Sequence, residues 1–190
     1  MMDTLNATGL REAFSDLAER LHKQSVHARL YIAGGAAMAL AYDENRLTRD
    51  VDAAIEAGWD EVTTAAHAIA AERGWPASWL KEQATAYMPP PAGRCGRVVF
   101  EHANLTVCAA SPEQMLAMKA RSARRVDEAD FAVLLSLTGL DDAAAVIELA
   151  ERVIPGAPLS PRQIRWIEHC LTAAGTSGLA CEPPDDVSRT

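Results

Sequence analysis

Apolar residues recur along the chain at two different spacings. In residues 10–23 they return every three to four positions, which is the spacing of one buried face of a helix. Shorter unbroken apolar runs are typical of buried strands instead. We expect helices over residues 10–23, 36–42, 60–73, 126–137, 142–153 and 161–174, and another that begins at Ser111. We expect strands over residues 28–33, 47–55, 97–101 and 104–109.

Two of the expected helices have a clear start in the sequence. Ser111-Pro112-Glu113-Gln114 combines a serine N-cap, a proline in the first turn and a glutamine that completes a capping box, and Ser160-Pro161-Arg162-Gln163 repeats the device. The order of elements predicts an α+β fold, in which helices flank a small mixed β-sheet and a C-terminal helical region follows. We divide the chain into a core of residues 1–110, a helical region of residues 111–176 and a flexible tail of residues 177–190.

Composition and charge narrow the classes of protein. The 190 residues are 49% hydrophobic, which is enough for an ordinary core, and the formal net charge of −8 argues against a uniformly basic nucleic-acid-binding surface. No apolar run approaches the roughly 20 residues that span a bilayer, and the first residues lack the pattern of a secretory signal. Four scattered cysteines without a C-x-x-C pair fit neither a zinc site nor a disulfide scaffold. We therefore expect reduced thiols, a cytoplasmic location and no membrane partner.

The first candidate for chemistry joins a glycine turn to two acids. Gly34 and Gly35 end the strand of residues 28–33, and Asp50 and Asp52 lie on the next strand. Alternate strand residues point to the same face, so the two carboxylates should lie together. Backbone N–H groups at a glycine turn that opens a helix favour an anion, and a pair of carboxylates suits a hard cation such as Mg²⁺. The alternative is a glycine turn beside two solvated acids.

The second candidate is a charged segment in the C-terminal half. It carries four basic residues within seven positions, followed by two acids: Lys119, Arg121, Arg124, Arg125, Asp127 and Asp130. In a continuous helix Lys119 and both acids would fall within about 80° of each other, and a break near Arg125 would still leave the two segments as neighbours. A lysine here suits phosphate oxygens, and the basic residues suit an RNA backbone. The alternative is a solvated, charged helix face.

With both candidates in view, the chain resembles the minimal nucleotidyltransferase superfamily, and among its members the AbiEii/MenT-like toxins of bacterial toxin–antitoxin pairs. The resemblance covers residues 30–135. It depends on Gly34-Gly35-Ala36-Ala37, on Thr48-Arg49-Asp50-Val51-Asp52, on Trp79-Leu80 with Ala84, on Ser111 to Lys119, and on Arg125, Asp127 and Asp130 in that order.

The resemblance implies a nucleotidyltransferase-like mixed sheet whose metal carboxylates face a cleft that the C-terminal helical region closes. It implies transfer of a nucleotide from an NTP, with Mg²⁺ or Mn²⁺, to the 3′ end of tRNA, and an antitoxin protein as a partner. Asp50 and Asp52 would hold the metal and take part in catalysis. The nucleotide-binding residues would be Gly34, Gly35, Lys119 and Arg121. The late catalytic acid would be Asp130, or else Asp127, and RNA would contact Arg121, Arg124 and Arg125.

The chain departs from the family pattern in two places. Gly35 replaces the usual serine, and the third metal carboxylate has no obvious counterpart, since Glu101 is the only acid on the hairpin of residues 97–109. Two alternatives therefore stay open. In one, a protein or a small molecule accepts the nucleotide instead of tRNA. In the other, the chain is a catalytically silent nucleotidyltransferase-like binding module or an antitoxin-type partner.

Overall fold

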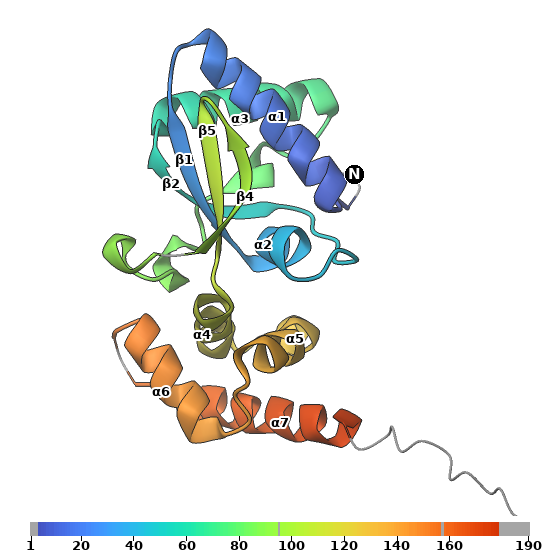
Figure 1. The fold of residues 1–190 in the computed structure, drawn as a ribbon, viewed down its shortest axis with the longest axis vertical. Helices are drawn as coiled ribbons and strands as arrows, with labels where there is room; N and C mark the ends of the chain where they lie inside the picture. The colour runs from blue at the N-terminus through green and yellow to red at the C-terminus, as the bar shows by residue number, and fades with distance from the viewer. Residues whose placement is uncertain (1–3, 95, 157, 179–190) are drawn as a thin grey trace, which may run out of the picture.

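Five strands form one mixed sheet, which confirms the predicted α+β fold (Figure 1). A computed structural model describes residues 4–94, 96–156 and 158–178. The strands are β1 (Ala28–Ala33), β2 (Val51–Ala57), β3 (Leu80–Lys81), β4 (Gly96–His102) and β5 (Leu105–Ala110), in the spatial order β3-β2-β1-β5-β4. The β1–β5 and β2–β3 pairs are parallel, whereas β1–β2 and β4–β5 are antiparallel.

Helices cover the sheet on one side and form a separate layer beyond its end. They are α1 (Ala7–Lys23), α2 (Gly34–Ala41), α3 (Trp59–Arg73), α4 (Pro112–Ser122), α5 (Glu128–Thr138), α6 (Ala143–Val153) and α7 (Pro161–Gly178). Helix α1 packs on β4 and β5, α3 packs on β2, and the two helices contact each other. Helices α4 to α7 lie together below the sheet in Figure 1. Within the described residues, no helix combines the length and apolarity needed to cross a bilayer.

The strand register decides which side chains face the helices. Leu30 pairs with Ile55 and Val107, and these apolar side chains face α1 and α3. The opposite face carries Tyr31, and it also carries Asp52, because Ala33 pairs with Asp52 and Tyr31 with Ala54. The face beside Tyr31 and Asp52 is therefore the one that can hold a polar site.

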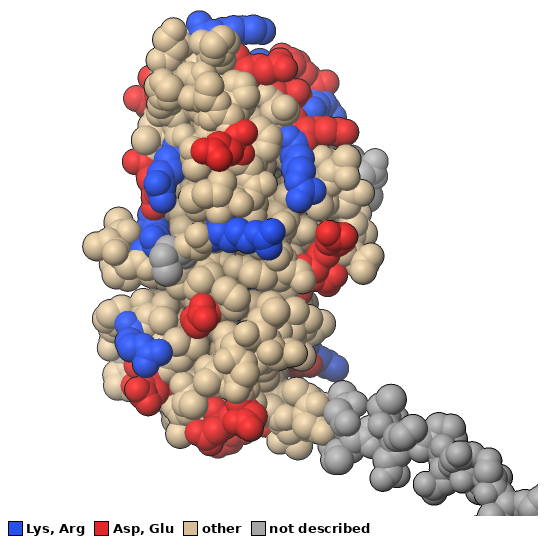
Figure 2. Space-filling model, in the orientation of Figure 1, with Lys and Arg blue, Asp and Glu red and all other residues tan. Residues whose placement is uncertain are grey.

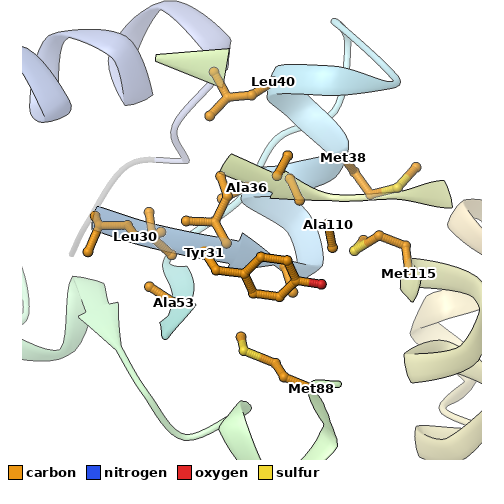
Figure 3. Close-up of a cluster of buried hydrophobic side chains, with 14 of the residues drawn as sticks. Leu30, Tyr31, Ala36, Met38, Leu40, Ala53, Met88, Ala110 and Met115 are labelled. Carbon is orange, nitrogen blue, oxygen red and sulfur yellow. The ribbon is translucent and has the colours of Figure 1, made fainter. Parts of the chain in front are cut away.

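Tyr31 also joins the sheet to the helical layer. Its buried hydroxyl donates to Gln114 Oε1 at 2.8 Å, and Gln114 is the residue that completes the predicted capping box of α4. The ring of Tyr31 and the thioethers of Met88 and Met115 lie together at this joint (Figure 3). The capping glutamine thus fixes the start of α4 against β1, and so places α4 beside the sheet.

Several predicted boundaries need correction. The strand at Ala28–Ala33 is correct, but the predicted strand over 47–55 begins only at Val51. The residues before it bend, and Thr48 exchanges two backbone hydrogen bonds with Leu5 (2.7 and 2.9 Å). Helix α1 begins at Ala7 rather than at the predicted residue 10, because the Asn6 side chain caps it by accepting a hydrogen bond from the Gly9 backbone N–H.

Two further differences concern the helical region. A continuous helix from Lys119 to Asp130 does not form, because Ala123 adopts a left-handed conformation (φ +44°) and a 3₁₀ turn, η4 (Arg125–Asp127), precedes α5. The last helix continues to Gly178 rather than ending near residue 174. Most of the predicted flexible tail, residues 179–190, lies outside the described residues.

Candidate active site

Asp50 and Asp52 converge on one ammonium group. Lys81 Nζ lies 2.5 Å from Asp50 Oδ2 and 3.6 Å from Asp52 Oδ1. Lys81 belongs to the two-residue strand β3, where it pairs with Asp52 across the parallel β2–β3 ladder, so both side chains leave the same face. The structure therefore brings the two acids to one ammonium, although Asp50 lies in the bend before β2 and not on the predicted strand.

The two predicted glycines each leave space for a different neighbouring side chain. Gly34 ends β1 and begins α2 with φ +65°, and a Cβ there would lie 2.9 Å from Asp52 Oδ2. Gly35 faces Thr48 instead, since its Cβ would lie 2.7 Å from Thr48 Oγ1, which donates to the Asp50 carbonyl at 2.9 Å. The hydroxyl that the family pattern places at position 35 would therefore collide with the segment that carries the acids.

Gly35→Ser tests whether Thr48 leaves no space for a side chain at position 35. We expect the free energy of unfolding to fall by about 1–3 kcal/mol, because Thr48 must shift to admit the new Cβ. Gly156→Ser is the matched control, since a Cβ there meets nothing within 4 Å and the residue is exposed. Urea unfolding followed by circular dichroism measures both variants. Equal stability of the two would contradict the packing argument.

Two cavities meet at the acid pair. One, of about 510 Å³, lies against α4 and is lined by Tyr87, Met115 and Met118 among others. The other, of about 530 Å³, lies against residues 46–50 and η4. The residues that line both are Gly34, Asp52, Lys81 and Arg124. We call the two cavities together the cleft, with the acids at its junction.

Lys119 lies at the centre of a buried charge network. Its Nζ is 2.8 Å from both Asp127 Oδ1 and Asp130 Oδ2. Arg124 Nε bonds the other oxygen of Asp127 at 2.8 Å, and Arg46 Nε bonds the other oxygen of Asp130 at 2.8 Å. The side chain of Lys119 is only 6% exposed. The predicted lysine and acids do come together, but the lysine charge is already shared by two carboxylates.

The pKa values follow these contacts. Burial raises the pKa of Asp52, the Lys81 ammonium opposes that rise, and the neighbouring Asp50 carboxylate adds to it. Burial alone would lower the pKa of Lys81, but its hydrogen bond to Asp50 and the charges of both acids leave it raised. Burial would raise the pKa of Asp127, yet hydrogen bonds from Arg124 and Lys119 leave it lowered. The partners of Asp127 therefore outweigh its burial, whereas those of Asp52 do not.

The predicted arginine patch is divided among different surroundings. Arg121 Nη2 donates to the Ile154 carbonyl at 2.7 Å, which ties α4 to the end of α6. Arg124 is at the cleft junction with 64% of its side chain exposed, and Arg125 is exposed but lines neither cavity. On the face shown in Figure 2, basic and acidic side chains are interspersed. Arg121 and Arg124 both line the 510 Å³ cavity against α4, whereas Arg125 lies outside it.

Metal ligands beyond the acid pair are not provided by the described residues, which contain no group of three or more His, Cys, Asp or Glu side chains suited to a metal. Glu101 lies on β4, at the opposite edge of the sheet from β3, and β5 carries no acid. Asp50 and Asp52 still offer oxygen donors around one point. This set fits Mg²⁺ or Mn²⁺ if substrate phosphates and water complete the coordination.

Sequence reasoning missed Lys81 as a site residue. A two-residue strand has no periodicity to detect, and residues 77–94 form no long regular element. The available signal was indirect: Lys81 follows the apolar pair Trp79-Leu80 and is one of three lysines in the chain. Only the pairing of β3 with β2 reveals that this lysine reaches the acids.

Comparison of the chain with models of protein families, with curated proteins and with solved structures found no match. The class of this protein therefore has to be argued from its fold and from the geometry of the cleft.

Proposed function

We propose that this protein is a nucleotidyltransferase, and specifically the toxin of a bacterial toxin–antitoxin pair that transfers a nucleotide from an NTP to the 3′ end of tRNA in the cytoplasm. The observation that carries the proposal is the meeting of Asp50 and Asp52 beside Gly34, where two cavities join. Two carboxylates at such a junction suit a reaction in which a metal-bound triphosphate meets a second substrate.

The two cavities suggest a place for each substrate. The α4 side offers the ring of Tyr87, which is 52% exposed, beside the buried Met115 and Met118, and this ring suits a nucleobase. The phosphates would then lie at the junction, beside Gly34 and Arg124. The acceptor would enter the other cavity, where Arg49 is exposed.

The reaction needs positioning more than covalent chemistry. The 3′-hydroxyl oxygen of the acceptor forms a bond to the α-phosphorus, the bond from that phosphorus to the β-phosphate bridging oxygen breaks, and pyrophosphate leaves. The hydroxyl proton passes to a carboxylate of the cleft or to water. Asp50 and Asp52 would hold Mg²⁺ or Mn²⁺, which neutralises charge on the phosphates. Since Lys119 is paired with Asp127 and Asp130, we assign these three residues to positioning Arg124 and the 46–50 segment.

The test is Mg²⁺-dependent transfer of a labelled nucleotide. The protein is incubated with each NTP, labelled at the α-phosphate, and with total RNA, purified tRNA or a protein lysate in separate reactions. The proposal expects label in the tRNA band, lost on addition of EDTA. Label in protein or in a small molecule would keep the enzyme class and replace the acceptor. Absence of label in every arm would overturn the proposal.

A catalytically silent binding module is the second candidate. It is favoured by the Lys81 ammonium on the acid pair and by the lack of a third carboxylate near it within the described chain. Calorimetry separates the two candidates at the binding step. Absence of Mg²⁺-dependent NTP binding would favour the silent module.

A further inference from the structure

Lys81 is the basic residue that contacts both acids of the cleft. It lines both cavities, and its ammonium nitrogen is within 4 Å of both acids. In the part of the chain that the structure describes, no other lysine or arginine forms an ion pair with Asp50 or Asp52. Arg124 is near, but its guanidinium bonds Asp127.

Rotation of the Lys81 side chain alone can break its ion pairs with Asp50 and Asp52. Lys81 is on an edge strand of two residues, and 24% of its side chain is exposed. Four rotatable bonds let a lysine ammonium move by several ångströms without any backbone motion. Lys119, in contrast, pairs with two carboxylates, each of which also bonds an arginine, and it is almost completely buried.

We infer that Lys81 is an internal counter-cation that competes with a divalent cation for Asp50 and Asp52, and that it turns to the phosphates when an NTP enters the cleft. This inference rests on the proposed function for its second half. The ammonium and a divalent cation need the same oxygen atoms, so they exclude each other. A triphosphate brings new anionic oxygens to the junction, which gives Lys81 another partner and frees the acids.

The consequence is an order of binding. Without a nucleotide, Lys81 neutralises part of the acid pair and the affinity for a free divalent cation stays low. With a nucleotide, the same lysine adds to phosphate binding. Removing the ammonium should therefore strengthen the affinity for a free divalent cation and weaken the affinity for the nucleotide. Removing a lysine with a merely structural role would weaken both affinities or change neither.

The experiment compares Lys81→Met with Lys23→Met. Lys23 is exposed at the end of α1, so its replacement removes the same charge far from the cleft. Binding of Mn²⁺ alone is measured by electron paramagnetic resonance. Binding of each NTP with Mg²⁺, without RNA, is measured by calorimetry.

For Lys81→Met we expect Mn²⁺ to bind about tenfold more tightly than to the unmodified protein, since two partly exposed ion pairs no longer compete. We expect the NTP to bind about tenfold or more weakly, since a charge-assisted hydrogen bond is lost. Lys23→Met should match the unmodified protein in both. Adding Asp52→Asn to Lys81→Met should remove the gain in Mn²⁺ affinity, which assigns it to the acid pair.

The outcomes separate the inference from the proposed function. Unchanged or weaker Mn²⁺ binding by Lys81→Met overturns the counter-cation role, and unchanged NTP binding overturns the phosphate role. Failure of the unmodified protein to bind any NTP overturns the proposed function and the phosphate role together. The Mn²⁺ measurement decides the counter-cation role in that case too.

Discussion

Asp52→Ala is expected to reduce nucleotide transfer at least about a hundredfold, because the cleft then loses one of the two carboxylates that hold charge at the phosphates. The measurement is the rate of Mg²⁺-dependent incorporation of labelled nucleotide into tRNA. Asp60→Ala is the matched control, since Asp60 is exposed in the first turn of α3 and lines neither cavity of the cleft. Undiminished transfer by Asp52→Ala would remove the proposed enzyme.

The same variant should not be unstable. Burial raises the pKa of Asp52 in the fold, with Lys81 opposing and Asp50 adding to the rise. An acid whose pKa is higher in the folded chain than in the unfolded chain destabilises the fold while it is charged, and this cost disappears as the pH falls and the group is protonated. At neutral pH Asp52→Ala should therefore unfold at the same urea concentration as the unmodified protein or a higher one. Loss of activity with stability retained is the pattern expected of a functional carboxylate.

Lys119→Met is expected to lower the free energy of unfolding by about 3–5 kcal/mol, because it leaves two buried carboxylates without their shared ammonium. Asp127 and Asp130 are 3% and 4% exposed, so water cannot replace the lost partner. Urea unfolding measures the change. Lys23→Met, which removes an exposed lysine, should change the stability by less than about 0.5 kcal/mol.

A triple variant checks the cause. Lys119→Met combined with Asp127→Asn and Asp130→Asn also removes the two buried carboxylate charges, which Arg124 and Arg46 alone would otherwise oppose, so it should recover part of the loss. If the triple variant is less stable than Lys119→Met alone, uncompensated charge is not the source of the instability. If Lys119→Met is as stable as the unmodified protein, the network does not hold α4 to α5.

Short-range signals predicted the regular elements well. The apolar run of residues 28–33 is a strand with those bounds, and the capping box at Ser111 starts α4 where the sequence places it. Each of these depends on residues within a few positions of one another, so local physics decides them. The strand predicted over 47–55 was too long, because Thr48 pairs with Leu5 rather than with the sheet.

The sequence predicted most residues of the candidate site, but it did not predict which of them form ion pairs with each other. The i, i+2 spacing of Asp50 and Asp52 and the order of Lys119, Asp127 and Asp130 are sequence properties, and the structure brings each group together. Which cation meets which acid was not predictable. Lys119 was expected to bind phosphate; the structure shows it paired with Asp127 and Asp130, and it shows Lys81 paired with Asp50 and Asp52.

By itself the sequence determined the α+β class and the glycine turn before the acids, because each follows from backbone geometry over a few residues. Strand alternation fixes the face of Asp52 but not of Asp50, which lies in the bend before β2. The tertiary structure alone decided that Lys81 reaches those acids, that Thr48 fills the space beside Gly35 and that Arg46 closes the network around Lys119. These pairs are separated in the chain and meet only when the strands pair and α4 and α5 pack beside them. Charge partners are chosen by distance in space, which no local pattern records.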